Sequence, residues 1–164
     1  MRVNTLNIRT SDICCFSETT QILMADSTQK YITDIKIGDL IASINSKTTE
    51  VGCDTQSQVE EYIILKTNQG HEIAITGEHP VLTDTGWKQV SALELGDKVA
   101  CQDKLDENYW YEEVVSLELK KDNREMYNLI CDDCAIIANG IVCGDFHIQY
   151  KMIMQNQFRR TKTN

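Results

Sequence analysis

The chain has 164 residues and a mass of 18.7 kDa, with 41% hydrophobic and 25% charged residues. These values are typical of one globular domain with a hydrophobic core. The net charge of −9 argues against nucleic acid or an anionic membrane as a partner, because phosphate binding needs clustered Lys and Arg. No apolar run approaches the roughly 18 residues that a membrane span needs. We therefore expect a monomer without nucleic-acid or membrane partners.

Seven cysteines are present, and the N-terminal sequence lacks the long hydrophobic segment of an export signal. Free thiols in a reducing compartment fit this odd number better than a disulfide framework. The sequence thus predicts an intracellular, cytoplasmic location.

A phrase of 13 residues occurs twice, at Lys30–Ala42 and Lys88–Ala100. The identical pairs are Lys30/Lys88, Gly38/Gly96, Asp39/Asp97 and Ala42/Ala100, and apolar positions match between them. Two copies are too few for a solenoid, which needs at least about three repeats. They predict one domain folded about an internal pseudo-twofold axis, in which each Gly-Asp pair forms the turn before a strand.

The other predicted elements are mostly strands joined by short turns. In chain order, the sequence predicts a loop at Ser43–Gln58, a hairpin of Glu61–Thr67 with His71–Thr76, a hairpin of Glu113–Leu119 with Glu125–Cys131 around a turn at Lys120–Asn123, and a hairpin of Ala135–Ala138 with Ile141–Cys143. Asn139-Gly140 in the last hairpin is a strong turn signal, because both residues must accept positive φ. From His147 onward the apolar periodicity fades, so the last residues are expected to be peripheral.

Four segments in a fixed order carry a family resemblance: Cys15–Thr20, Thr76–His79, Met126–Leu129 and Ala138–Val142. Together with the repeated phrase, they resemble the Hint family of inteins, Hedgehog C-terminal domains and, closest, bacterial intein-like domains. The resemblance implies an all-β, horseshoe-shaped fold with an internal pseudo-twofold. It places the domain at residues 15–146, with an N-terminal flank at 1–14 and a C-terminal flank at 147–164.

The resemblance implies that Cys15 is the nucleophile. In the family, this cysteine attacks the preceding carbonyl, here that of Cys14, and converts the amide into a thioester. Cys15 is preferred over Cys14 because the apolar Phe16 follows it. Thr76 and His79 match the residues that hold the peptide bond and protonate its departing nitrogen.

The C-terminal half of the implied site departs from the splicing pattern. Asn128 stands where inteins usually have an assisting aspartate, and Gly144-Asp145 falls where they have the terminal His-Asn pair. Phe146 occupies the position of the acyl acceptor and has no nucleophilic group. The expected activity is therefore single-turnover self-cleavage at the Cys14–Cys15 bond, with the attached polypeptide as substrate and without protein splicing.

Two alternatives from other classes remain open. The domain could be a degenerate Hint domain that serves as a structural or interaction module. A small thiol-based metal or redox protein is the third, because Cys131 and Cys134 form a CxxC pair. A full metal site would need two more ligands, with Cys101 and Cys143 as candidates, so we expect no metal and no cofactor.

Overall fold

The computed structural model describes residues 15–131, 135–145, 147–152 and 154–155. Most of them belong to strands, of which two are long and the others short, and residues 147–152 and 154–155 are helical. No helix in these ranges is long and apolar enough to cross a membrane. The strands are β1 (Gln21–Leu23), β2 (Gln29–Tyr31), β3 (Leu40–Ala42), β4 (Thr48–Glu50), β5 (Cys53–Thr67), β6 (Glu72–Ile75), β7 (Pro80–Thr83), β8 (Gly86–Gln89), β9 (Lys98–Cys101), β10 (Trp110–Ile130), β11 (Ala135–Ala138) and β12 (Ile141–Gly144).

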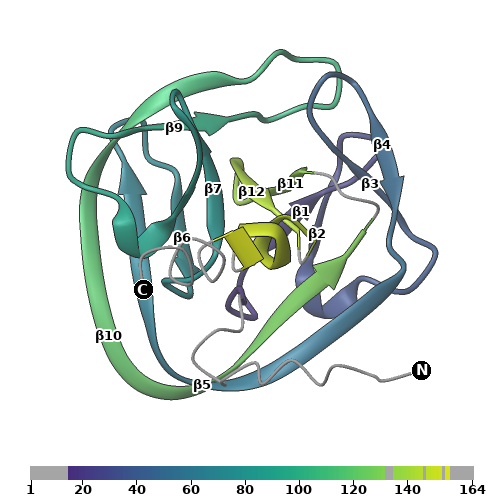
Figure 1. Cartoon of the computed structure of the whole chain (residues 1–164). Helices are drawn as coiled ribbons and strands as arrows, with labels where there is room; N and C mark the ends of the chain where they lie inside the picture. Colours follow the sequence, from purple (N-terminus) through teal and green to yellow (C-terminus); the bar gives the residue numbers. More distant parts are fainter. Residues whose placement is uncertain (1–14, 132–134, 146, 153, 156–164) are drawn as a thin grey trace.

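One curled antiparallel sheet holds almost all of these strands. Its order is β2-β1-β11-β12-β7-β9-β10-β5-β6, with β8 paired to β7, and β3 with β4 forms a separate two-stranded sheet. Figure 1 shows β5 and β10 curving around the outside, while β7, β11 and β12 lie at the centre. The predicted all-β, horseshoe-shaped fold is confirmed.

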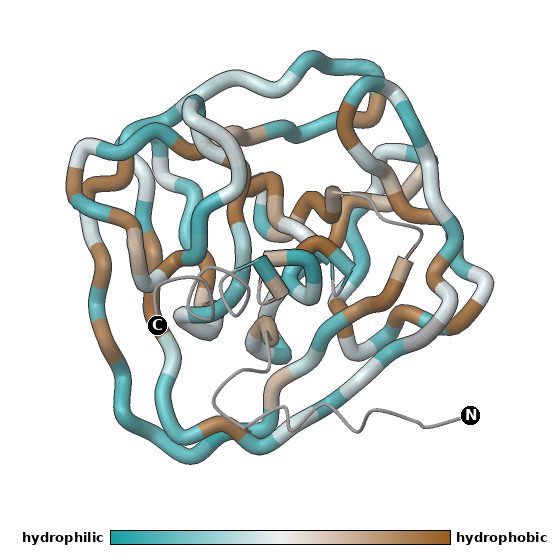
Figure 2. Tube along the Cα trace, in the orientation of Figure 1, coloured by the Kyte–Doolittle hydropathy of each residue, from teal (hydrophilic) through white to brown (hydrophobic). Residues whose placement is uncertain are grey.

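The outer ribbon corrects two predictions. Lys120–Asn123 is not a turn, because β10 runs through it without reversing and pairs with β5 on both sides of a register shift between Lys121 and Arg124. Ser43–Gln58 is not simply a loop, since it contains β4 and the first residues of β5. This part of the ribbon lies away from the core, and hydrophilic colours predominate there in Figure 2. Its charged residues therefore have the composition of a turn although they form a strand.

The pseudo-twofold is visible in matching hydrogen bonds of the two repeated phrases. Each phrase has a short 3-10 helix, η2 (Ile32–Asp34) or η3 (Val90–Ala92), followed by a glycine with φ near +90°. The Asp39 carboxylate accepts bonds from Lys30 Nζ at 2.9 Å and from the Lys36 N–H at 2.9 Å. Asp97 repeats this arrangement with Lys88 Nζ at 3.0 Å and the Glu94 N–H at 2.9 Å. The predicted internal repeat is therefore confirmed.

The core lies between the ribbon and the central strands, where the aliphatic side chains of β1, β7, β11 and β12 are buried. The predicted hairpin of β11 and β12 is confirmed, with Asn139 at φ 48° and Gly140 at φ 78°. Asn139 also bonds the Gln21 N–H through Oδ1 at 2.8 Å and the Glu72 carbonyl through Nδ2 at 2.9 Å. The turn thus joins β1 and β6 to the centre of the molecule.

Candidate functional site

Cys15 is fully buried between β6 and the end of β10. The next residue, Phe16, exchanges two backbone hydrogen bonds with Tyr127, at 2.7 and 2.8 Å. Ser17 then donates its N–H to the Ala74 carbonyl at 3.1 Å. These bonds and the isolated β-bridges of Phe16 to Ile75 and Tyr127 hold the chain between β6 and β10, and they fix the backbone on the C-terminal side of Cys15.

Thr76 makes two hydrogen bonds with the backbone of Cys15. The Cys15 N–H donates to Thr76 Oγ1 at 2.9 Å, and the Thr76 N–H donates to the Cys15 carbonyl at 3.0 Å. The nitrogen held by Thr76 is the one that belongs to the Cys14–Cys15 peptide bond. A hydroxyl can accept a hydrogen bond from this nitrogen and still donate its own hydrogen to another group. Thr76 can therefore orient the Cys14–Cys15 peptide bond while its hydroxyl hydrogen stays available.

His79 lies one turn after Thr76, because its N–H donates to the Thr76 carbonyl at 3.1 Å. Its ring is fully buried and packs on Phe16, with ring centroids 4.2 Å apart. Nε2 lies 2.9 Å from the Gly144 carbonyl oxygen, which can only accept, so Nε2 carries the hydrogen. Nδ1 is buried and has no hydrogen-bond partner of normal geometry among the described residues.

Burial sets the protonation of both groups. It lowers the pKa of His79 to about 4, although the nearby backbones of Gly144 and Cys15 oppose this shift. It raises the pKa of the Cys15 thiol to about 12, and a hydrogen bond with Ser57 offsets only part of that effect. At neutral pH the site therefore contains a thiol and a neutral imidazole, whose Nδ1 carries a lone pair that no described residue uses.

Asn128 is buried on β10, but its hydrogen bonds differ from those of Cys15, Thr76 and His79. Its Oδ1 accepts the Leu129 N–H at 2.8 Å, and its buried Nδ2 has no partner of normal geometry in the part of the chain that the structure describes. The residue lines a polar cavity of about 210 Å³ together with Thr33, Thr55 and Gln56. An amide has no basic lone pair at neutral pH, so Asn128 can orient or donate a hydrogen bond but cannot act as a base.

Asp145 caps the C-terminal helical segment. Its Oδ1 accepts the Ile148 N–H at 3.0 Å, and its carbonyl accepts the Gln149 N–H at 3.1 Å. Its Oδ2 lies 3.3 Å from the Cys131 nitrogen and 3.1 Å from His147 Nδ1. Both carboxylate oxygens are therefore occupied by structural contacts.

Of the five predicted site residues, the structure brings together Cys15, Thr76 and His79. Within the described residues, neither Asn128 nor the Asp145 side chain is hydrogen-bonded to any of those three. Sequence reasoning missed the Gly144 carbonyl, which fixes the His79 tautomer. It also missed Ser57, which lies in a stretch predicted as a loop.

The cysteines whose side chains are described, Cys15 included, are all buried. Cys15, Cys101 and Cys143 are free thiols. Cys134 lies outside the described residues, so the structure does not test the CxxC pair. Cys101 and Cys143 are fully buried, as is expected for apolar cysteines in a core.

A curled all-β sheet with an internal repeat and a buried Cys beside a Thr-x-x-His turn defines the class of Hint-fold domains. A sequence profile described as "Vint: Hint-domain" matches residues 14–140. The chain therefore belongs to the Hint-domain family, whose fold is that of autoprocessing-type domains. No curated protein matches the chain in sequence.

Solved structures give the same fold. A DnaB intein from Synechocystis sp. PCC 6803 is 24% identical with a TM-score of 0.73, and the match covers 81% of this chain and 99% of that one. The bacterial intein-like domain from Clostridium thermocellum is 22% identical with a TM-score of 0.70, covering 80% and 98%. The gp41-1 intein is 23% identical with a TM-score of 0.69, again covering 80% and 98%. At these identities the likeness shows the fold alone.

Proposed function

We propose that this domain converts its own Cys14–Cys15 peptide bond into a thioester and thereby releases the polypeptide that precedes Cys15. Intein-like Hint domains act within flanking polypeptides, so the substrate is the attached chain and each molecule reacts once. The observation that carries the proposal is the hydrogen bond of 2.9 Å from the Cys15 N–H to Thr76 Oγ1, next to a neutral, partly unpaired His79.

The reaction begins with proton transfer from the thiol. The lone pair on His79 Nδ1 accepts the Cys15 proton, and Sγ attacks the carbonyl carbon of Cys14. The C–N bond then breaks, and the imidazolium returns its proton to the departing nitrogen while Thr76 holds that nitrogen in place. His79 thus acts first as a base and then as an acid, and the product is an isomer of the starting chain.

The pKa values indicate slow chemistry. Burial raises the pKa of the Cys15 thiol to about 12 and lowers the pKa of His79 to about 4, so the proton transfer is strongly uphill before the two charges attract each other. Release requires water, a thiol or an amine to attack the thioester carbonyl.

Protein splicing is not part of the proposal, because the C-terminal half lacks the groups that it needs. The backbone nitrogens of Ile148 and Cys131 occupy both carboxylate oxygens of Asp145. Gly144 offers a carbonyl to His79 but no imidazole of its own. Phe146 has no group that could accept an acyl chain.

The second candidate function is a Hint domain without chemistry that serves as a structural or interaction module. The full burial of Cys15 favours it, because a buried protonated thiol is a weak nucleophile. The two functions differ in one observable property, which is whether the bond before Cys15 reacts in the folded protein.

A fusion with a folded reporter ahead of residue 1 distinguishes them. Under the proposal, dithiothreitol accelerates release of a fragment that ends at Cys14, and hydroxylamine gives the same fragment as a hydroxamate, identifiable by mass. Neither reagent cleaves an ordinary amide, so a protein without the thioester stays intact. A fusion that is folded by circular dichroism and gives no thiol-dependent release would leave only the structural module.

A further inference from the structure

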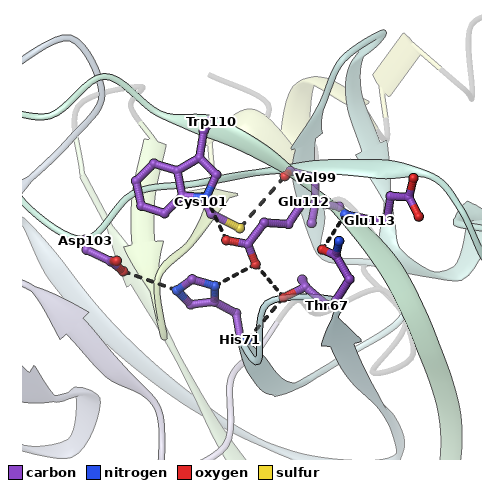
Figure 3. Close-up of polar contacts among 9 residues, drawn as sticks. Thr67, His71, Val99, Cys101, Asp103, Trp110, Glu112 and Glu113 are labelled. Atoms are coloured by element: carbon purple, nitrogen blue, oxygen red, sulfur yellow. Dashed lines mark hydrogen bonds and ion pairs between the residues drawn. The ribbon is translucent and has the colours of Figure 1, made fainter.

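A second buried cluster of chemistry-bearing side chains lies apart from Cys15 and His79. His71 precedes β6, Cys101 ends β9 and Glu112 belongs to β10, and Figure 3 shows the three side chains pointing toward one another. One ligand atom from each, His71 N, Cys101 Sγ and a Glu112 oxygen, lies within 4.8 Å of the other two. Cys101 and the Glu112 side chain are fully buried, and the His71 side chain is 19% exposed.

Neighbouring groups orient two of these three side chains. Thr67 Oγ1 donates to Glu112 Oε1 at 2.6 Å, and Trp110 Nε1 donates to Oε2 at 2.7 Å. On the far side of the imidazole, His71 Nε2 lies 3.2 Å from Asp103 Oδ1 (Figure 3). A carboxylate on one ring nitrogen with the other nitrogen facing a ligand set is the usual outer arrangement of a metal-binding His.

The backbone also keeps this ring in place. Gly140 lies directly against the His71 ring, and a Cβ at that position would collide with Cδ2 and Nε2. Gly140 also has a positive φ of 78°, so a side chain there would be strained for a second reason. The His71 ring therefore lies between the β11–β12 turn and Glu112 and contacts both.

We propose that this cluster binds one Zn²⁺ ion through His71 Nδ1, Cys101 Sγ and the Glu112 carboxylate, with water at the fourth position. Tetrahedral zinc with these ligand types places the ligand atoms roughly 3.4–3.8 Å apart. The present limit of 4.8 Å means that a pair of ligand atoms needs to approach by at most about 1.4 Å. His71 Nδ1 and Glu112 Oε1, now 2.8 Å apart, would move apart by roughly 0.6 Å. One imidazole, one thiolate and one carboxylate match the preference of zinc for nitrogen and sulfur ligands.

Binding of Zn²⁺ with release of protons leaves the net charge of the cluster unchanged. His71 Nδ1 lies 2.8 Å from Glu112 Oε1 and Nε2 lies 3.2 Å from Asp103 Oδ1. Both carboxylates can only accept, so these contacts fit a metal-free His71 that carries a hydrogen on each ring nitrogen. Zn²⁺ displaces the Nδ1 proton and the thiol proton of Cys101, so two protons leave for each ion that enters, while His71 keeps the Nε2 hydrogen on Asp103. Cys⁻ and Glu⁻ then neutralise the ion, as a buried site requires.

This site shares only Cys101 with the one that the sequence raised, in which Cys101 and Cys143 were candidates to complete the Cys131/Cys134 pair, and the sequence predicted no metal. It is also independent of self-cleavage, because it shares no residue with Cys15, Thr76 and His79. The bound ion would link the β5–β6 connection to β9 and β10. Because the ligands come together only in the folded chain, zinc should raise the Tm.

The test uses the full chain with Cys15→Ala, which removes the reactive thiol. Co²⁺, which reports its ligands in visible and near-ultraviolet spectra, is titrated first and then displaced by Zn²⁺. We expect one equivalent, tetrahedral d–d bands and one sulfur-to-cobalt charge-transfer band. X-ray absorption at the zinc edge should count one sulfur ligand, and this measurement does not depend on whether any ligand variant folds.

Matched variants assign the ligands. Cys101→Ser and His71→Gln should each weaken Co²⁺ binding by at least about 100-fold, whereas Cys131→Ser should bind as the parent does. Asp103→Asn should weaken binding by about 10–100-fold through the imidazole. Asp106→Asn, an exposed change in the same loop, should leave the affinity unchanged.

Three results would overturn the proposal. They are no uptake of Co²⁺ or Zn²⁺ at micromolar concentration, two or more sulfur ligands at the zinc edge, and a spectrum that survives Cys101→Ser in a folded variant but disappears in Cys131→Ser. The last two would assign the metal to the CxxC pair. The first would leave the cluster as a buried ion pair.

Discussion

The two ends of the Hint domain use their polar groups in opposite ways. At the N-terminal end, Thr76 holds the nitrogen of the Cys14–Cys15 bond, and Nδ1 of His79 is buried without a hydrogen-bond partner within the described ranges. At the C-terminal end, backbone nitrogens of the following helical turn and of Cys131 occupy both oxygens of Asp145. A buried group with an uncommitted lone pair is available for chemistry, whereas a fully bonded one contributes to stability.

His79 connects these two ends, because its Nε2 donates to the Gly144 carbonyl while its other nitrogen faces the Cys15 side. The C-terminal strand β12 therefore has a role in the N-terminal half of the site, since it selects the tautomer. We therefore expect changes at the N-terminal end to alter the reaction, and changes at the C-terminal end to alter mainly the stability of the domain.

The largest expected effect comes from Cys15→Ala, which should abolish release of an N-terminal reporter completely. No other thiol can form the five-membered intermediate with the carbonyl of Cys14. Gel and mass analysis of the fusion over a day, with dithiothreitol, checks this. Cys14→Ala is the matched control and should still be cleaved, because Cys14 supplies only the acyl group. Release that persists in Cys15→Ala would remove the proposed nucleophile.

His79→Ala should slow release by about 10²–10⁴-fold, the usual cost of losing a general acid–base group. Thr76→Ala should cost less, and Thr76→Ser, which keeps the hydroxyl, should cost least. First-order rates with dithiothreitol in excess measure all three. A His79→Ala rate within a few fold of wild type would show that another group moves the proton.

His79 should also make stability depend on pH. Its pKa is about 4 when folded, against about 6.5 in the unfolded chain, so the unfolded state binds more protons between these values. Its contribution is complete above pH 6.5 and is lost as the pH falls toward 4. By pH 4.5 the loss should be about 2–3 kcal/mol.

Urea unfolding of the Cys15→Ala protein at pH 7 and pH 4.5, with and without His79→Gln, measures this term. His79→Gln should lose less stability on acidification than its parent by that amount, since other groups titrate equally in both. Parallel pH profiles would mean that His79 is not held neutral by burial.

The smallest expected effect is a several-fold acceleration by Asn128→Asp. Asn128 is an amide where a carboxylate could help to accept or place a proton, and its buried Nδ2 has no hydrogen-bond partner among the residues that the structure describes. The same release assay measures the change, with Asn128→Ser as a control that adds no charge. A slower Asn128→Asp protein would indicate that the amide nitrogen itself donates to the reacting carbonyl.

Much of the fold could be predicted because the relevant signals are local. Gly38-Asp39 and Gly96-Asp97 each fix a turn through their own φ angle and carboxylate, and Asn139-Gly140 fixes a hairpin. The long strand β10 could not be predicted, since Lys120–Asn123 resembles a turn until its partner β5 is known. The helical segment after Asp145 was also missed, because its apolar pattern is weak.

The candidate site follows the same division. Thr76 and His79 are close in sequence, so their pattern identifies them. Contacts between distant residues leave no such pattern: Gly144 is 65 residues from His79, and Glu112 is 41 residues from His71. Only the folded sheet shows that a carbonyl selects the His79 tautomer and that a second polar cluster exists.

A fusion with different reporters at both ends tests the comparison between the two ends most directly. After incubation with dithiothreitol, mass spectrometry identifies every product in one sample. The account predicts a released N-terminal fragment that ends at Cys14, while the C-terminal reporter remains attached to the domain. Ligation of the two reporters, cleavage after Asp145 at a comparable rate, or no reaction in the folded fusion would contradict it.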